Sequence, residues 1–262
     1  MKRYCRIYWL LIKINCARLF AYRPNLINSA IATIGWGLVS IFSMVLLTTK
    51  TSSIYGWNKN ELMLIGGIFT IILGITHTLF SRNFDKFSLT INKGYLDGIL
   101  LRPLDSQFQI SCWYMNFTSA LRIPIGFIFT LIILQQVHIS ISLITYIMFL
   151  VFLILGVSVI YSTWFLVATI IIWYPNLSNL VGFLYNFNNL GRYPKDIITH
   201  TGNIFLFVLI PLTLVASVPV KLLAHTSNWK DCVLLLTIAC VLFYVSRKFW
   251  QFALRFYTSA SG

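Results

Sequence analysis

Seven charged side chains gather between positions 81 and 105, in the longest polar interruption of a very apolar chain. They are Arg82, Asp85, Lys86, Lys93, Asp97, Arg102 and Asp105. Basic and acidic side chains mixed in one short segment suit contact with a soluble protein partner or with lipid headgroups. The segment is therefore the first place to look for an interaction site.

A helix over about 84–99 would give this segment one apolar face. Helical spacing places five side chains on that face: Phe84, Phe87, Ile91, Tyr95 and Ile99. The opposite face carries Arg82, Lys86, Lys93 and Asp97. Pro103 ends the helix, because proline lacks an amide donor and disfavours the helical conformation in the residue before it. The spacing predicts a short amphipathic helix that lies on a membrane surface or docks on a partner.

No catalytic motif accompanies this segment. The sequence contains no P-loop, no H-E-x-x-H, no nucleophile elbow and no zinc-binding set of cysteines and histidines. We therefore expect no catalytic residue and no metal site on this chain. His77, near the end of an apolar run, is a candidate because intramembrane histidines are often functional, but it could simply bond a neighbour. The six acidic residues include no mid-membrane pair, which a proton-coupled carrier would need.

The composition identifies the class of protein. Hydrophobic residues make up 58% of the 262 residues and charged residues 10%, whereas a soluble domain has about 25% charged residues. The chain is therefore an all-α integral membrane protein. Its net charge of +14 does not indicate nucleic-acid binding, because the Lys and Arg residues are spread over loops.

Six transmembrane helices account for the apolar runs. They are predicted over about 26–48, 62–80, 121–134, 141–174, 203–218 and 232–245. The fourth run would measure about 50 Å as one helix, longer than the hydrocarbon core of about 30 Å. It is either one tilted or protruding helix, or a span followed by a membrane-hugging segment. An arrangement of eight spans in which this run is split is the alternative.

Residues 1–23 are predicted to form an amphipathic helix on the cytoplasmic membrane surface. Six basic residues lie in this stretch, and apolar side chains recur at helical spacing. A cleaved signal peptide is the alternative, but the following apolar run is too long and lacks a small-residue cleavage site.

Small residues recur every four positions on the second predicted span, at Gly66, Thr70 and Gly74. Small side chains let helices approach closely in lipid, where packing replaces the hydrophobic effect. The stripe is therefore a predicted helix-packing face, either inside the chain or at a dimer contact.

The basic residues also predict the orientation. Fifteen would lie in cytoplasmic segments, including Arg192 and Lys195 of an asparagine-rich connector over 175–200, and four in external loops such as 49–61. This bias places both termini in the cytoplasm of a multi-pass protein of the cell membrane.

Two segments resemble one family. The sequence INKGYLDGILLRPLD (91–105) is similar to a motif of type-2 ABC export permeases, in the branch whose permeases are separate chains from their ATPase. The tail FWQFALRFYTSASG (249–262) resembles the ending of that branch. The matching positions of the first motif are Ile91, Gly94, Leu96, Asp97, Leu100, Leu101, Arg102, Pro103 and Leu104.

The resemblance implies a single permease domain over residues 1–262, with a connecting helix over 1–23. Such a permease pairs with a second, identical or sister, permease in the lipid bilayer and binds two cytosolic ABC ATPase subunits. ATP and magnesium would be held by the ATPase, and no cofactor by this chain. The cytoplasmic segment 81–105, between spans two and three, would be the coupling helix.

The resemblance also suggests which residues contact the ATPase. The coupling set is Phe84, Asp85, Phe87, Gly94, Asp97, Gly98, Leu101, Arg102, Pro103 and Leu104. Asp97 and Arg102 would make polar contacts, Gly94 and Gly98 would allow close approach, and Pro103 would fix the exit turn. An intrahelical or lipid-headgroup contact is the alternative for Asp97 and Arg102.

The expected function is export of a hydrophobic or amphipathic substrate. A membrane assembly or immunity factor and a secondary carrier are the competing classes. The first predicts tolerance of polar changes over 94–104, and the second predicts an essential buried charge.

Overall fold

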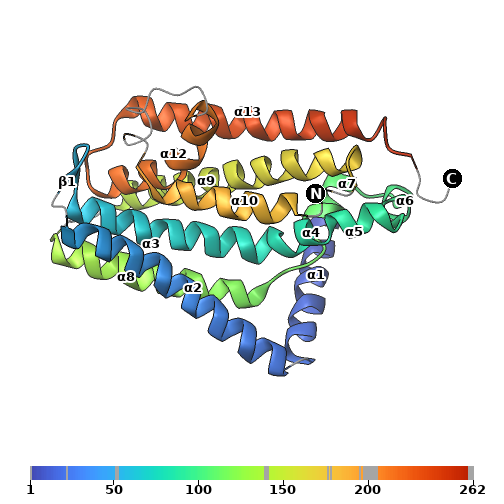
Figure 1. The fold of residues 1–262 in the computed structure, drawn as a ribbon, viewed down its shortest axis with the longest axis horizontal. Helices are drawn as coiled ribbons and strands as arrows, with labels where there is room; N and C mark the ends of the chain where they lie inside the picture. The colour runs from blue at the N-terminus through green and yellow to red at the C-terminus, as the bar shows by residue number, and fades with distance from the viewer. Residues whose placement is uncertain are drawn as a thin grey trace.

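The computed structural model describes residues 2–21, 23–50, 53–138, 142–175, 177, 179–194, 196 and 206–258. Long helices run side by side, and α1 (Lys2–Ala21) lies across one end of them (Figure 1). The long helices are α2 (Arg23–Lys50), α3 (Lys59–Thr76), α8 (Arg122–Gln136), α9 (Leu143–Thr169) and α13 (Trp229–Ala253).

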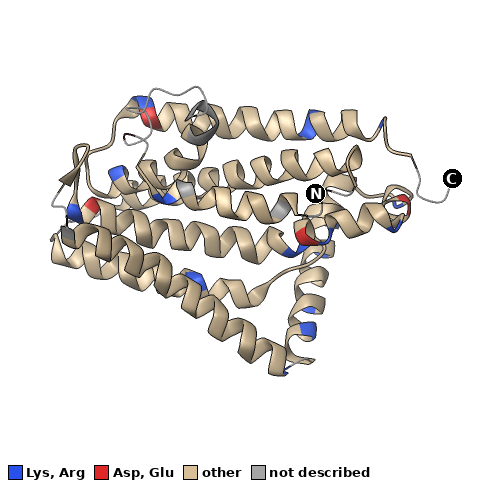
Figure 2. Ribbon diagram, viewed as in Figure 1, with Lys and Arg blue, Asp and Glu red and all other residues tan. Residues whose placement is uncertain are grey.

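Charged side chains gather at the two ends of this bundle, and most of the length of the helices carries few of them (Figure 2). Five helical stretches of the described chain are long and apolar enough to cross a membrane. They are Arg23–Thr49, Lys59–Asn92, Phe117–Gln136, Leu143–Ile172 and Trp229–Ala253. The chain is therefore a multi-pass membrane protein.

The predicted fourth and fifth spans differ in how they fold. The 141–174 run forms one continuous helical stretch from Leu143 to Ile172, 30 residues long, or about 45 Å. The described part of this run is thus one continuous helix, which does not fit the eight-span alternative that splits it. The fifth predicted span corresponds to α12 (Leu206–Leu223), which is 18 residues long. Asn203, where that span was predicted to begin, lies outside the described residues.

Helix α3 is the centre of the bundle and packs against α2, α8, α9 and α12. It crosses α8 where two glycines meet: a Cβ on Gly126 would lie 2.6 Å from the carbonyl oxygen of Gly67. The predicted stripe lies beside this crossing. Gly66 faces Met44 of α2, and Gly74 faces Ile123 and Arg122 of α8.

Thr70, between these two glycines, is buried and donates to the carbonyl oxygen of Gly66 at 2.7 Å. Its hydroxyl is thus satisfied inside its own helix. The contacts of all three stripe residues lie within this one chain.

A two-stranded hairpin marks one end of the bundle, which we call the hairpin end. Strands β1 (Ser53–Ile54) and β2 (Trp57–Asn58) flank a turn with positive φ at Tyr55 and Gly56. The buried indole of Trp57 donates to Asp196 at 2.7 Å. Lys221, near the end of α12, pairs with the same carboxylate at 3.5 Å. These contacts fasten the hairpin to two later segments.

The contact between Trp57 and Asp196 corrects one prediction. Residues 175–200 were expected at the cytoplasmic surface and residues 49–61 outside, and the two expectations cannot both hold. Pro175 accepts from Ser88 at 3.2 Å, far along the bundle from the hairpin. The chain then returns to the hairpin end through α10 (Leu180–Asn188) and η4 (Asn189–Arg192).

The burial of side chains within residues 175–200 explains why the composition of this stretch gave a wrong prediction. Within the Asn-rich stretch, Leu184 and Asn188 are buried, so it packs as part of the bundle instead of forming a solvated connector. Arg192 contacts Ser43 of α2 at 3.3 Å, so it does not belong to the cytoplasmic count of basic residues. Asn176 and Lys195 lie outside the described residues.

The opposite end, which we call the terminal end, holds the beginning of α1 and the end of α13 (Figure 1). Residues 2–21 are helical, as predicted, with Leu11 and Asn15 buried against the bundle. Trp9 and Phe20 stay exposed. An apolar exposed face with flanking cations is typical of a helix in the membrane interface.

Candidate functional site

Residues 81–105, which we call the coupling segment, lie at the terminal end as a continuation of α3. A π-helical turn, η1 (His77–Ser81), leads into α4 (Arg82–Asp85), α5 (Phe87–Asn92) and α6 (Tyr95–Leu100). The single helix predicted over 84–99 is therefore wrong. Gly94 adopts φ +67°, a left-handed conformation that ends α5 and starts α6 in a new direction.

This break changes which side chains are buried. Leu96 is 0% exposed, whereas Tyr95, expected on the apolar face, is 58% exposed. Phe84, Phe87 and Ile91 precede the break and are buried as predicted. Local periodicity predicted the first half of the segment and failed after Gly94.

The buried phenylalanines anchor the segment to two long helices. The ring of Phe84 lies 5.9 Å from Trp164 of α9, and that of Phe87 lies 6.0 Å from Trp250 of α13. Phe165 of α9 contacts Trp250 at 5.4 Å, which closes the cluster. Because close-packed side chains transmit displacement, a push on the segment would be felt by α9 and α13.

Asp85 ties the segment to α10. Its carboxylate accepts from the hydroxyl of Tyr185 at 2.7 Å. The Tyr185 ring also lies 5.1 Å from His77 and 4.8 Å from Trp164. His77 therefore belongs to an aromatic cluster that braces the start of the segment.

The outer turn of the segment, residues 98–104, is its exposed tip. Leu101 is an apolar side chain that is 86% exposed. A Cβ on Gly98 would meet nothing within 4 Å. Pro103 is also exposed, and Leu104 closes the turn by donating its amide to Arg102 at 2.7 Å.

Asp105 ends the segment and joins it to the other motif. Its carboxylate caps α7 (Ser106–Cys112) by accepting from the amide of Phe108 at 2.9 Å. It also forms a two-pronged ion pair with Arg247 of α13. One helical turn further on, the indole of Trp250 donates to Ser106 at 3.0 Å.

Residues 34–261 of the chain match the family described as ABC-2 family transporter protein. The chain belongs to this family. Comparison with curated proteins gives no match, and comparison with solved structures gives none either. The resemblance found in the two sequence motifs is thus confirmed, and the protein is an ABC-2 permease, a membrane subunit that is not itself catalytic.

The two motif segments of this ABC-2 permease pack on each other. Arg247 and Trp250 lie just before and within the tail that resembles the family. Arg247 contacts Asp105, the last residue of the first motif, and Trp250 contacts Ser106, the residue after it. Tyr257 of the tail lies beside Asp97, and burial together with this carboxylate raises the pKa of its hydroxyl. Arg247, Trp250 and Tyr185 were absent from the predicted site, because their partners lie about a hundred or more residues away.

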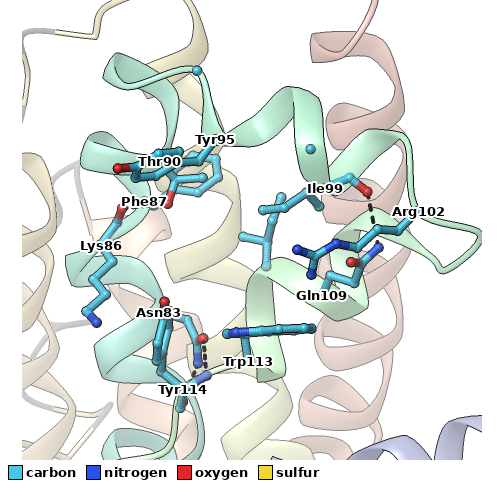
Figure 3. Close-up of a pocket in the computed structure, with 13 residues that line it drawn as sticks. Asn83, Lys86, Phe87, Thr90, Tyr95, Ile99, Arg102, Gln109, Trp113 and Tyr114 are labelled. Carbon is cyan, nitrogen blue, oxygen red and sulfur yellow. Dashed lines mark hydrogen bonds between the residues drawn. The ribbon is translucent and has the colours of Figure 1, made fainter.

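Arg102 points away from the tip of the permease. Its guanidinium lies 4.9 Å from the centre of the Trp113 ring. Both side chains line a cavity of about 430 Å³ between the segment and α7 (Figure 3). Asp97 and Arg102 thus contact aromatic side chains of the protein itself, although Arg102 is exposed, as are Gly98, Leu101 and Pro103.

Proposed function

We propose that this permease forms the translocation path of an ATP-driven exporter and is powered by a separate cytosolic ATPase. The coupling segment would be the lever, with Leu101 inserted into a cleft of the ATPase. The observation that carries the proposal is the contrast within the segment. Its base is fixed by buried aromatic side chains, and its tip presents an exposed apolar side chain.

The anchoring contacts support a mechanical role for the segment. ATP binding closes an ATPase dimer and would displace the tip. Phe84 and Phe87 would pass that displacement to α9 and α13 through their contacts with Trp164 and Trp250. ATP drives the change only if it favours one state of the complex, and here it would do so through the ATPase.

We propose six crossings, with both termini in the cytoplasm. Helices α10 and α12 would together make the fifth crossing, since Pro175 lies at the terminal end and Lys221 at the hairpin end. Excluding Arg122, Arg192 and Lys195, thirteen basic residues remain at the terminal side against four at the hairpin side. This bias supports a cytoplasmic coupling segment.

Co-purification tests the proposal. Full-length permease, produced with its native ATPase and purified in mild detergent, is expected to carry an ATP-hydrolysing subunit in equal amount. Leu101→Asp is expected to lose that subunit, because a carboxylate cannot replace an apolar anchor in a dry cleft. Tyr55→Asp, an equivalent change of an exposed side chain at the hairpin end, is the matched control and is expected to keep it.

Transport without any ATPase would contradict the proposal and favour a secondary carrier. Normal export by Leu101→Asp and Pro103→Gly would favour a membrane protein without coupled transport. Insertion of each variant is checked by its yield in the membrane fraction, so that loss of association is not confused with loss of the protein.

A further inference from the structure

We propose that the cavity beside Arg102 binds the phosphate headgroup of an anionic glycerophospholipid. We call it the headgroup cavity. It lies between the coupling segment and α7 and is lined by Asn83, Lys86, Phe87, Thr90, Gly94, Tyr95, Gly98, Ile99, Arg102, Gln109, Ile110, Trp113 and Tyr114. The proposal is independent of ATPase docking and rests on the contacts of this cavity.

The cavity concentrates positive charge on aromatic walls. Lys86 lies 3.8 Å from the centre of the Tyr114 ring, and Arg102 lies 4.9 Å from that of Trp113 (Figure 3). The guanidinium of Arg18, from α1, approaches the Tyr114 ring at 5.8 Å. No acidic residue of the described chain lines the cavity. Two cations that line one cavity without a carboxylate favour an anionic ligand.

The position of α1 sets the depth of the cavity in the membrane. Asn15 of α1 donates to the carbonyl oxygen of Trp113 at 3.0 Å. Helix α1 has the exposed apolar side chains and cations of an interfacial helix. Trp and Tyr side chains prefer the same headgroup level. A phosphate at this depth therefore belongs to a lipid of the adjacent leaflet.

Gln109 adds a second recognition element. It is 2% exposed, and its amide nitrogen donates to the carbonyl oxygens of Ile99 and Leu104. Its side-chain oxygen has no hydrogen-bond partner within the described part of the chain. A buried acceptor without a hydrogen-bond partner suits a ligand that supplies a hydrogen-bond donor. Phosphatidylglycerol has both the anionic phosphate and a hydroxyl donor.

Lipid titration of the purified full-length permease, followed by native mass spectrometry, tests the proposal. Dioleoyl phosphatidylglycerol is expected to bind about tenfold more tightly than dioleoyl phosphatidylcholine, since each basic residue near the surface strengthens binding of anionic lipid. Phosphatidylmethanol carries the same charge without the hydroxyl and is expected to bind about fivefold more weakly than phosphatidylglycerol.

Matched variants distinguish binding in the headgroup cavity from general attraction of anionic lipid to positive charge. Lys86→Gln with Arg102→Gln is expected to weaken phosphatidylglycerol binding about tenfold. Arg3→Gln with Lys93→Gln removes two exposed cations outside the cavity and is expected to bind like wild type. Lys86→Arg with Arg102→Lys keeps both charges and is expected to retain binding, which shows that the effect does not come from misfolding.

Three results would overturn the proposal. The first is wild-type phosphatidylglycerol affinity in the Lys86→Gln, Arg102→Gln variant. The second is full displacement of the lipid by soluble glycerol 3-phosphate, which would assign the cavity to a free phosphate ester. The third is loss of ATPase association in that variant with lipid binding unchanged, which would assign the cavity to a protein partner. Equal binding of phosphatidylglycerol and phosphatidylmethanol would overturn the role of Gln109.

Discussion

Arg247 joins two segments of the chain that lie 142 residues apart. Its guanidinium contacts both carboxylate oxygens of Asp105 and also Gln107 at 3.1 Å. Asp105 in turn caps α7. A bidentate pair of this kind fixes direction as well as distance. Arg247 therefore fixes the position of Asp105, the last residue of the coupling segment, relative to α13.

Replacing Arg247 by Gln is expected to destabilise the permease by about 1–2 kcal/mol, because the half-buried carboxylate of Asp105 loses its charged partner. Thermal unfolding in detergent should show a melting temperature lower by about 2–4 °C per kcal/mol. Lys248→Gln removes an exposed cation on the next residue and should leave the melting temperature unchanged. Equal melting temperatures for the two variants would contradict the assigned role of Arg247.

For single residues, the sequence predicted helical structure in this segment but not its contacts. The motif similarity grouped Asp97, Arg102 and Pro103 in one stretch. It could not show that Arg102 turns back over Trp113, because the direction of a side chain depends on tertiary packing. The pairing of Asp105 with Arg247 could not be predicted either, because an ion pair between residues far apart in the chain leaves no local sequence pattern.

Gly94 decides the shape of the coupling segment as an element. Its φ of +67° is a conformation that costs other residues about 1 kcal/mol. Gly94→Ala is thus expected to lower stability by about that amount and to favour a continuous helix, which would move the tip. Reduced export at normal insertion is the expected readout.

Gly98→Ala is the control for this change, because Gly98 lies inside α6 and a Cβ there meets nothing. Replacing glycine by alanine in a helix should stabilise the protein by up to about 1 kcal/mol. If Gly94→Ala and Gly98→Ala behaved alike in unfolding, the left-handed break would have no special role.

The crossing of α3 and α8 depends on two glycines that the predicted stripe did not include. A Cβ on Gly126 would lie 2.6 Å from the backbone oxygen of Gly67, which has no flexible side chain to move aside. Gly126→Ala is expected to destabilise the bundle by about 1–3 kcal/mol through overpacking. Gly35→Ala on α2, where nothing lies within 4 Å, should be neutral or stabilising in the same unfolding measurement.

Hydropathy predicted the long helices well because each carries apolar side chains over a length comparable to the thickness of a membrane. It failed over 175–200, where frequent asparagines suggested a solvated connector. There Leu184 and Asn188 are buried by contacts from elsewhere in the bundle. The helix over 84–99 failed for a local reason, since one left-handed glycine shifts the register of all later side chains.

For the whole molecule, the proposed orientation can be checked with short epitope tags. A tag in the hairpin turn after Tyr55 should be reached by antibody on intact cells. A tag at the C-terminus should be reached only after permeabilisation, because basic residues at the terminal end hold it in the cytoplasm. The reverse pattern would place the coupling segment outside, where no ATPase could reach it.

A photo-crosslinking amino acid at position 101 tests the central claim most directly. In cells producing the permease with its native ATPase, illumination is expected to yield a covalent product that contains the ATP-hydrolysing subunit. The same crosslinker at position 55, at the hairpin end, is expected to yield none. Absence of the ATPase from the product at 101, with the permease inserted and folded, would contradict the role of the exposed tip.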